Sequence, residues 1–569
     1  MGSLGDLAVF CPYKTVAVPE GALLVCRMPP AAPPLDPRWG LVQVARRHGA
    51  WLAERSPAIN ALLAPLHRTQ ELTPAGEVVL GDPGAGAWVA VPSLLPRLCD
   101  RSVAGRRRTN YLFLLDALRD RVPAAFEQLP AGASPFVFPI EVDDKPALLA
   151  RLAGHGVLGL NLWSVPHASL PATGFPDAQR RRRRTVGLPV HQELRPDDLE
   201  RIIAATGLRA RPQPELRLKP LAGFEAEADA WQALAERADN IFATREWLSM
   251  WWRHFGAGQA RLLGCWRAGG KLAAILPLYA SRVGPARALR FLGHGISDQL
   301  GPICDPAERC AVARALRRAL GGGLLGGWDV LLGEEFPGQQ GWSALLGATV
   351  VHHEASPVLR ARGRSFEEIL ASGSANFRQE VGRRERKLQR EHELRFRLAS
   401  DRDRLQDDLT ILFDLHAARW SGDESGAFSP ARRAFHRDFA PLALERGWLR
   451  LWLAEVDGRP VAALYGLRFA GSELFYQAGR DPAWDRFSVG FVLLAHAIRV
   501  ALEDGAVEYR LLRGDHPYKQ RFADHDPGLE TFVAAHGALP RAATALVASL
   551  AERDRGRHWL GRIARSGAD

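Results

Sequence analysis

The clearest pattern of apolar and polar positions lies between residues 448 and 512. Three apolar segments there have the length and composition of strands: residues 448–456, 459–470 and 473–480. The pairs that separate them, Asp457-Gly458 and Gly471-Ser472, are of the kind that forms tight hairpin turns. Apolar residues at helical spacing follow over 488–504, and then a short apolar run over 507–512. The pattern predicts three strands, a helix and a fourth strand.

Helices are expected before these strands. A basic amphipathic segment within 365–399 predicts a helix that leads into a strand, and 407–420 and 431–447 predict two more helices, the last ending at Gly447. Residues 222–360 have a similar but less complete plan. Two helices are expected within 229–256, followed by a hairpin over 260–282 that turns at Gly269-Gly270. The fold class is therefore α/β (α+β), with two related lobes at 222–360 and 361–540.

The second helix of the first lobe is aromatic, with Trp247, Trp251 and Trp252 on it. Aromatic stripes pack into a core more often than they bind a ligand, so we expect these side chains in the interior. Asp298 follows a predicted strand in a glycine-rich loop, a setting that suits either a tight turn or the wall of a cleft.

A cluster of polar residues follows the last predicted strand of the second lobe: Arg513, Gly514, Asp515, Tyr518 and Lys519. Convergent polar groups at the rigid ends of apolar strands are a poor way to build a core, but they suit a binding or catalytic site. We therefore expect the functional site of the second lobe here.

The first 208 residues form a different unit. Two short apolar strands, LAVF and ALLV, flank a loop that carries Lys14. The five arginines Arg180–Arg184 predict a solvated loop, with contact to a phosphate or an acidic partner as the alternative. Residues 209–221 are rich in proline and charge, which predicts a linker, and residues 541–569 predict a basic helical tail.

Composition limits the classes of function. The chain has 569 residues, which suggests about three units, and a net charge of +11. Only six of its 74 basic residues are lysines, so arginine occupies ordinary surface positions and a nucleic-acid partner is not expected. The six cysteines lack CxxC spacing, which argues against disulfides and a bound metal. Without an apolar run long enough for a membrane span, a cytoplasmic, soluble protein is expected.

The two lobes together resemble the CelD/BcsL branch of the GNAT acyltransferases, which is related to the Fem-type aminoacyltransferases with paired GNAT-like lobes. The resemblance covers residues 222–540. Its segments are REWLSMWWRHFG and RFLGHGISDQLG in the first lobe, and HAARW, GWLRLWLAEVDGRPVAALYGLRF, FYQAGRDPAW and RGDHPYKQRF in the second. It implies transfer of an acyl group from acyl-CoA to an amine. It also implies that Gln477 and Gly479 lie where the sheet admits the thioester.

The residues suit this chemistry. A CoA pyrophosphate needs free backbone N–H groups at a helix start, and Ser488, Val489 and Gly490 open the predicted helix 488–504. Candidate roles are assigned as follows: Asp515 and His416 position or deprotonate the amine, Tyr518 protonates the leaving thiolate, and Arg513 and Lys519 hold a phosphate. In the competing interpretations, Arg513 and Asp515 form an ion pair that pins the loop, and His416 is a satisfied helix histidine.

The first 208 residues resemble the second half of a DegT/DnrJ/StrS sugar aminotransferase, a fold-type I enzyme that uses pyridoxal phosphate. The matching segments are the stretch around Lys14 and residues 106–118, 135–157, 161–167 and 188–205. The resemblance implies that Lys14 is the Schiff-base lysine. Only thirteen residues precede it, so the groups that hold the cofactor in that family are missing. Either another polypeptide supplies them, or the unit is a remnant of a fold-type I small domain.

Together the two resemblances suggest acylation of an amino sugar in envelope or exopolysaccharide biosynthesis. Two alternatives remain: a Fem-like transfer of an aminoacyl group from charged tRNA, and a non-catalytic partner that docks a complete aminotransferase. The N-terminal unit would also suit a homodimer contact.

Overall fold

The computed structural model describes most of residues 86–535 and short segments between residues 6 and 45. The gaps after residue 86 are at 99–101, 131, 163–170, 172–173, 212–214, 257–258, 284–285 and 420–424. The chain divides into two compact units, Met1–Arg211 and Pro212–Asp569. Both Lys14 and the predicted tail at 541–569 lie outside the described residues. Among the helices that are described, none is both long and apolar enough to cross a bilayer.

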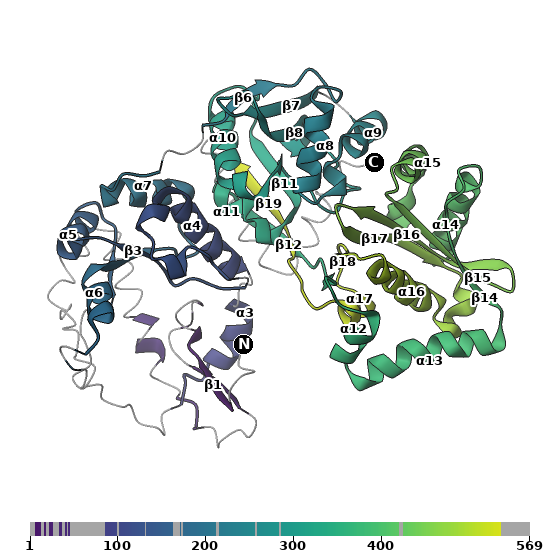
Figure 1. The fold of residues 1–569 in the computed structure, drawn as a ribbon, viewed down its shortest axis with the longest axis horizontal. Coiled ribbons are helices and arrows are strands. Elements are labelled where there is room, and N and C mark those ends of the chain that lie inside the picture. Colours follow the sequence, from purple (N-terminus) through teal and green to yellow (C-terminus); the bar gives the residue numbers. More distant parts are fainter. Residues whose placement is uncertain are drawn as a thin grey trace. The chain divides into compact units, whose positions relative to one another are not determined.

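The N-terminal unit contains an isolated hairpin and a small sheet with helices (Figure 1). Strands β1 (Leu7–Phe10) and β2 (Leu23–Cys26) pair antiparallel, as the sequence predicted. The remaining elements, in chain order, are α3 (Val91–Leu98), α4 (Ser102–Leu118), β3 (Val137–Glu141), α5 (Lys145–Gly154), β4 (Leu160–Asn161), α6 (Pro176–Arg184), β5 (Thr185–Pro189) and α7 (Pro196–Thr206). The small sheet has the order β3-β5-β4.

One expectation for this unit was wrong. Arg180–Arg184 form the second half of helix α6 and not a loop. Arginine is a good helix former, and a proline at the first helical position starts α6. The side chains remain largely solvated, as expected for a run of like charges.

The first lobe begins within the segment that was assigned to the linker, because residues 217–220 form the edge strand β6. Its further elements are α8 (Ala228–Arg237), α9 (Arg245–Phe255), β7 (Gln259–Trp266), β8 (Leu272–Val283), β9 (Ala286–Phe291), β10 (Ile303–Cys304), α10 (Arg309–Gly321), β11 (Val330–Pro337), α11 (Trp342–Leu346) and β12 (Thr349–Glu354). Strands β7, β8 and β9, helix α10 and strand β11 repeat the order expected of a GNAT lobe. The predicted hairpin is present, with Gly270 at a φ of 78° in its turn.

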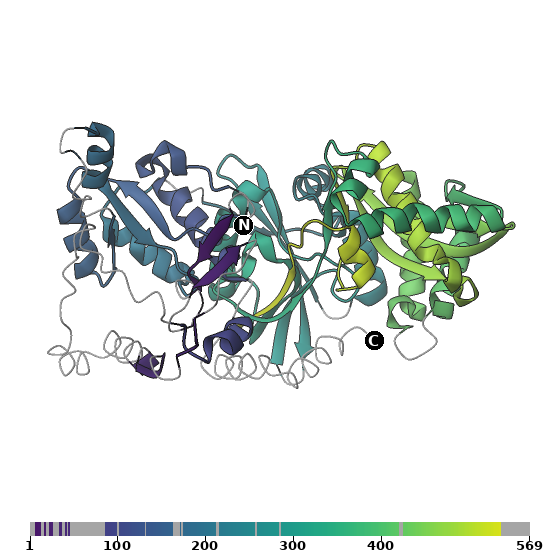
Figure 2. The ribbon, with the colours of Figure 1, turned by 90° about the horizontal axis from the view of Figure 1, so that it is seen from below.

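The second lobe has a six-stranded sheet in the order β13-β18-β17-β16-β15-β14. Its elements are β13 (Val358–Arg360), α12 (Phe366–Ser372), α13 (Ala375–Glu391), β14 (Leu394–Leu398), α14 (Leu405–Arg419), α15 (Pro430–Glu445), β15 (Leu449–Val456), β16 (Arg459–Phe469), β17 (Ser472–Arg480), α16 (Val489–Glu503), β18 (Glu508–Arg510) and α17 (Pro517–Phe522). Strand β19 (Leu529–Ala535) follows them in the chain. The predicted order of three strands, a helix and a strand is confirmed. Helices α12, α13 and α16 cover one face of the sheet, and α14 and α15 cover the other (Figures 1 and 2).

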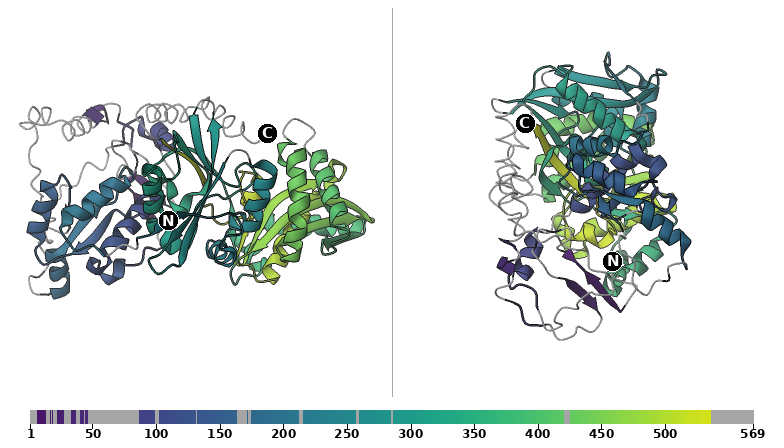
Figure 3. Two further views of the ribbon diagram at one scale, coloured as in Figure 1. Left: turned by 90° about the horizontal axis from the view of Figure 1, so that it is seen from above. Right: turned by 90° about the vertical axis from the view of Figure 1, so that its left-hand side faces the viewer.

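The last strand in the described part of the chain belongs to the first lobe's sheet. Strand β19 leaves the second lobe and pairs antiparallel with both β11 and β12, so that it completes the first lobe's sheet (Figure 3). The first lobe therefore cannot complete its sheet without residues that follow the second lobe in sequence. The two lobes form one folding unit.

The two lobes also share a core. The indole of Trp247 on α9 makes edge contacts with Phe435 and Phe439 on α15, at centroid distances of 4.9 and 4.8 Å. Trp247 and Trp251 are buried, and Trp252 packs against the same cluster. The prediction that the aromatic stripe belongs to the core is confirmed. The core that it enters includes the second lobe's helices.

Candidate active site

The strands of the second lobe part where a site is expected. Strands β17 and β18 are parallel and pair only through residues 472–474 and 508–510, although β17 continues to Arg480. Tyr465 pairs with Gln477 and its neighbour Gly466 pairs with Phe475, so Tyr476 is an extra residue, a β-bulge. A bulge at this point re-aims the side chains that follow. Pairing with β18 ends at Leu474, and the second half of β17, which diverges beyond that point, carries Gln477 and Gly479.

Helix α16 begins beside this divergence with exposed backbone donors. Ser488 precedes the helix in the left-handed conformation, with a φ of 55°, and its side chain does not cap the helix. Within the described residues, the N–H groups of Val489 and Gly490 have no backbone partner. A side-chain carbon at Gly490 would meet only the Arg480 side chain, at 3.4 Å. The helix start thus offers two donors and space beside them, as an anion requires.

Two cations that the sequence analysis missed flank the same helix start. Lys387 on α13 and Arg486 lie 5.2 and 4.6 Å from the centroid of the Phe487 ring. Neither cation forms an ion pair with a carboxylate in the described part of the chain. The sequence signal was available for Lys387, because it is one of only six lysines. Both charges add to the attraction for a phosphate at the helix start.

His416 and Gln477 lie together on the α14 side of β17. The imidazole of His416 is 3 % exposed and hydrogen-bonds with Gln477. Burial, aided by the nearby guanidinium groups of Arg419 and Arg433, lowers the pKa of His416 to about 4. The ring is therefore neutral at pH 7. The helix passes so close to the strand that a side-chain carbon on Gly479 would lie 2.3 Å from the His416 backbone nitrogen, so Gly479 is needed for packing.

Tyr518 lies on α17 near β17 and α14. Its ring is 6.3 Å from the ring of Phe475 and stacks on His516 at 5.7 Å. Its hydroxyl hydrogen-bonds with Arg419 of α14. Burial raises the pKa of Tyr518, which keeps the phenol protonated at neutral pH. A neutral phenol beside a guanidinium can supply a proton to a thiolate.

Arg513 does not pair with Asp515, so that interpretation was wrong. Its Nε lies 3.1 Å from Asp298 Oδ1 and its Nη1 lies 2.8 Å from Glu335 Oε1, and both carboxylates belong to the first lobe. Asp515 is exposed and accepts a hydrogen bond from the Gln520 amide at 2.9 Å. The long-range pairs are stronger because they are shielded from water, whereas Asp515 faces solvent.

Lys519 is buried behind Arg513. Its Nζ donates a hydrogen bond of 2.6 Å to the Arg513 carbonyl and lies 5.5 Å from the centroid of the Phe475 ring. Burial lowers the pKa of Lys519 to about 8, against the opposing influence of Asp298 and Glu354. Arg513 and Lys519 therefore tie the polar cluster to the first lobe, and both are engaged by protein groups.

The first lobe has a corresponding divergence that its own side chains fill. Strands β9 and β11 pair only through residues 288–290 and 330–332. Arg290 belongs to the last pair, and His294 and Glu334 lie beyond it. All three are buried, with Arg290 Nη2 3.3 Å and His294 Nδ1 3.0 Å from the Glu334 carboxylate. The Glu334 oxygen nearest His294 and both ring nitrogens of His294 are buried without an aligned hydrogen bond. Charged groups thus occupy the place where the second lobe offers its diverging strands.

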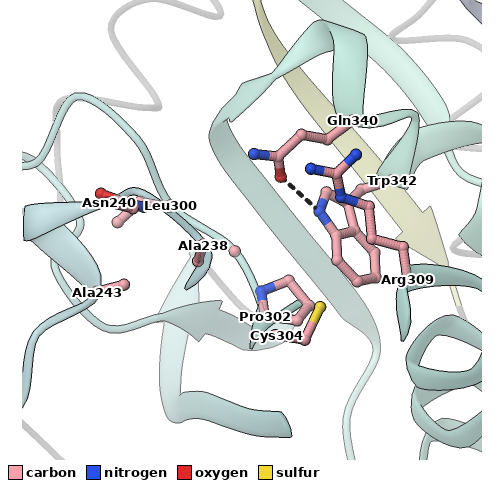
Figure 4. Close-up of a pocket in the computed structure, with 10 residues that line it drawn as sticks. Ala238, Asn240, Ala243, Leu300, Pro302, Cys304, Arg309, Gln340 and Trp342 are labelled. Atoms are coloured by element: carbon pink, nitrogen blue, oxygen red, sulfur yellow. Dashed lines mark hydrogen bonds between the residues drawn. The ribbon is translucent and has the colours of Figure 1, made fainter. Parts of the chain in front are cut away.

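A small pocket lies elsewhere in the first lobe (Figure 4). Arg309 at the start of α10 lies there beside Trp342, whose indole N–H donates a 2.9 Å hydrogen bond to Gln340. The space for a water-sized sphere inside it is ≈ 10 Å³, which is room for about one water molecule. The residues of the candidate site do not line it.

Comparison with known proteins identifies part of the chain. Residues 375–520 match the family model described as the acetyltransferase (GNAT) domain, so the chain carries a GNAT acyltransferase domain in its second lobe. No curated protein matches the sequence significantly.

Several solved structures resemble the C-terminal unit. FemX matches 58% of this chain and 100% of its own, at 11% identity and a TM-score of 0.42. A tandem GNAT protein from the clavulanic acid biosynthesis pathway matches 57% of this chain and 99% of its own, at 16% identity and a TM-score of 0.33. L-PGS from Bacillus licheniformis matches 57% and 97%, at 11% identity and a TM-score of 0.34. None of these matches specifies a substrate.

Proposed function

We propose that the second lobe transfers an acyl group from acyl-CoA to the amine of a small-molecule acceptor, and that the acceptor is an amino sugar. The observation that carries the proposal is the start of α16. Two backbone N–H groups without a backbone partner lie beside strands that diverge, within a domain of the GNAT acyltransferase family.

The donor would bind with its pyrophosphate at the N–H groups of Val489 and Gly490. The partial positive charge of the helix start favours a phosphate there. Lys387 and Arg486 add two cations that are not neutralised by carboxylates of the described residues. The pantetheine arm would then run along the diverging part of β17, past Gln477 and Gly479. A carbonyl of the pantetheine arm would form the hydrogen bond with β17 that a neighbouring strand forms in a continuous sheet, and that β18 does not form here.

The acyl transfer needs a free amine and a protonated leaving group. Neutral His416, held by Gln477, can accept a hydrogen bond from the amine and orient it. The amine nitrogen attacks the thioester carbonyl, and the C–S bond breaks as the C–N bond is completed. Tyr518 is suited to give a proton to the departing sulfur, because its phenol stays protonated beside Arg419. Asp515 is exposed, and we assign it to contact with the acceptor.

The acceptor class rests on the N-terminal unit, whose sequence resembles enzymes that install amines on nucleotide sugars. We also propose that the N-terminal unit docks an aminotransferase or a second copy of this chain. Pyridoxal phosphate enters no step, because Lys14 lies outside the described residues.

The test uses the full chain with acetyl-CoA and longer acyl-CoAs, each with nucleotide-linked amino sugars and, separately, with simple amines. Release of the CoA thiol should require the acceptor, and the product should carry the added acyl mass. Transfer from aminoacyl-tRNA without acyl-CoA turnover would support the Fem-like alternative. Stable co-purification with an aminotransferase and no turnover of either donor would support the non-catalytic alternative.

A further inference from the structure

Glu335 of the first lobe occupies an unusual position. Between Gly333 and Phe336 the register of β11 against β19 shifts by one residue, which marks a β-bulge. Within it Glu335 adopts a φ of 50°, in the left-handed region that non-glycine residues rarely occupy. A strained residue at a bulge is held there by its surroundings, and such positions are common at functional sites.

The surroundings of Glu335 come from both lobes. Oε1 accepts a 2.8 Å hydrogen bond from Arg513 Nη1, while Oε2 is buried and has no hydrogen-bond partner. Glu334, His294 and Asp298 also act on this carboxylate electrostatically. Lys519 and Glu354 in turn interact electrostatically with Arg513. Burial raises the pKa of Glu335 to about 7; Arg513 and His294 oppose this shift, and Glu334 and Asp298 add to it. One carboxylate oxygen is thus fixed by Arg513, and the other is enclosed without a hydrogen-bond partner.

Glu335 is connected to the candidate site by direct contacts. Arg513, which binds Glu335, accepts the hydrogen bond of Lys519 through its carbonyl. Lys519 lies over the ring of Phe475, and that ring contacts Tyr518. Asp298 also binds Arg513, but both Asp298 oxygens are engaged: Oδ1 by the guanidinium and Oδ2 by the Arg513 backbone N–H. Of the two first-lobe carboxylates on Arg513, only Glu335 has an oxygen without a partner.

We propose that Glu335 is the proton acceptor for the amine, so that the first lobe completes the active site of the second. This inference rests on the proposed acyl transfer. The second-lobe alternatives suit the role less well. Asp515 is exposed and bonded to Gln520, and a histidine whose pKa is about 4 is a weak base at neutral pH.

The protons balance. An acceptor ammonium gives one proton to Glu335 Oε2, and the carboxylate becomes a carboxylic acid that later releases the proton to solvent. The free amine attacks the thioester carbon, and the tetrahedral intermediate loses a second proton from nitrogen. That proton replaces the one that Tyr518 gives to the sulfur, so the products are an amide, the CoA thiol and one free proton.

The test compares Glu335→Gln with the parent enzyme by the pH dependence of kcat. In the parent, kcat should rise with pH through about 7, as the carboxylate becomes free to accept a proton. The position of this limb should not follow the pKa of the acceptor amine when several amines are compared. Glu335→Gln should lower kcat by roughly 100-fold or more and abolish the limb. The acyl-CoA dissociation constant, measured by calorimetry, should not change.

Glu354→Gln is the matched control. It removes a carboxylate that acts electrostatically on the same Arg513 and Lys519 but is not paired with Arg513, so it should retain the pH limb. If Glu335→Gln keeps the parental kcat and limb, the inference is wrong while the acyl transfer stands. If Glu335→Gln does not fold, the kcat of Glu335→Asp and the pH dependence of kcat in the parent enzyme test the inference instead. A limb that follows the amine pKa overturns the inference. If the parent turns over no acyl-CoA with any amine, the proposed function itself fails.

Discussion

The hydroxyl of Tyr476 on β17 donates a 2.7 Å hydrogen bond to the carbonyl of Ile296 in the first lobe. Tyr476 is the extra residue of the bulge between β16 and β17, so this irregularity also joins the two lobes. Tyr465 lies beside it at a ring distance of 5.7 Å, and its hydroxyl is buried without a hydrogen-bond partner. The two tyrosines form a matched pair for measuring what this contact contributes.

Tyr476→Phe should lower the free energy of unfolding by about 1–3 kcal/mol, because it leaves the buried Ile296 carbonyl without a donor. Tyr465→Phe should change it by much less, or raise it, because that hydroxyl is buried without a partner. Urea denaturation of both variants measures the difference. Equal effects of the two substitutions would show that the Tyr476 hydrogen bond contributes nothing beyond the loss of a hydroxyl group.

Substitutions at two glycines near the candidate site should have different effects, one on stability and the other on acyl-CoA binding. Gly479→Ala places a carbon 2.3 Å from the His416 backbone nitrogen and should destabilise the fold by about 1–3 kcal/mol or more. Gly490→Leu has space beside Arg480, so the fold should persist, but the side chain would enter the space assigned to the pyrophosphate. Calorimetry with acyl-CoA should show weaker binding for Gly490→Leu. An unchanged dissociation constant would show that acyl-CoA does not bind at this helix start.

Tyr518→Phe should lower kcat by roughly 100-fold, because it removes the proton for the leaving sulfur and keeps the ring. Acyl-CoA affinity should stay within about twofold, since the ring stack on His516 is preserved. Asp515→Asn serves as the comparison, and it should act mainly through the KM for the acceptor. Near-parental kcat for Tyr518→Phe would reassign the tyrosine to a structural role.

Local patterns predicted most of the second lobe. Strands β15, β16 and β17 and helix α16 follow from periodicity and turn residues that lie within a few positions of each other. The second turn was placed one residue too late. It is formed by Ala470 and Gly471, with φ values of 48° and 88°, and glycine occupies its second position. Asp457 and Gly458 show the same order in the first turn.

The site was less predictable, because its partners are far apart in sequence. Arg513 pairs with Asp298 and Glu335, and no local pattern links this arginine to carboxylates 215 and 178 residues apart from it. One signal was present. Glu334 and Glu335 follow the apolar run 330–332, just as Arg513 and Asp515 follow the apolar residues 511–512 in the second lobe. The strand exchange through β19 had no signal of this kind, because its sequence suits either sheet.

Strand β19 supplies another test. A chain that ends at Gly528 should lose the strand between β11 and β12 and leave both edges unpaired, which promotes aggregation. Hydrogen exchange should show loss of protection in the first lobe's sheet, although no residue of the first lobe is removed. A chain that ends at Ala535 is the control. Equal protection in both would mean that the first lobe completes its sheet without β19.

His436 makes the shared core sensitive to acid. Its ring is fully buried among Trp247, Phe435 and Tyr476, neither ring nitrogen has a hydrogen-bond partner, and burial lowers its pKa to about 3. Because the folded pKa lies below the unfolded value, the unfolded chain binds the extra proton first as the pH falls below about 6.5. Stability should therefore fall by up to about 1.4 kcal/mol for each pH unit from this group alone. His436→Phe should reduce the difference in unfolding free energy between pH 7 and pH 5. Comparing the two pH values within each variant cancels the change in packing, and an identical difference in both variants would show that His436 does not titrate with unfolding.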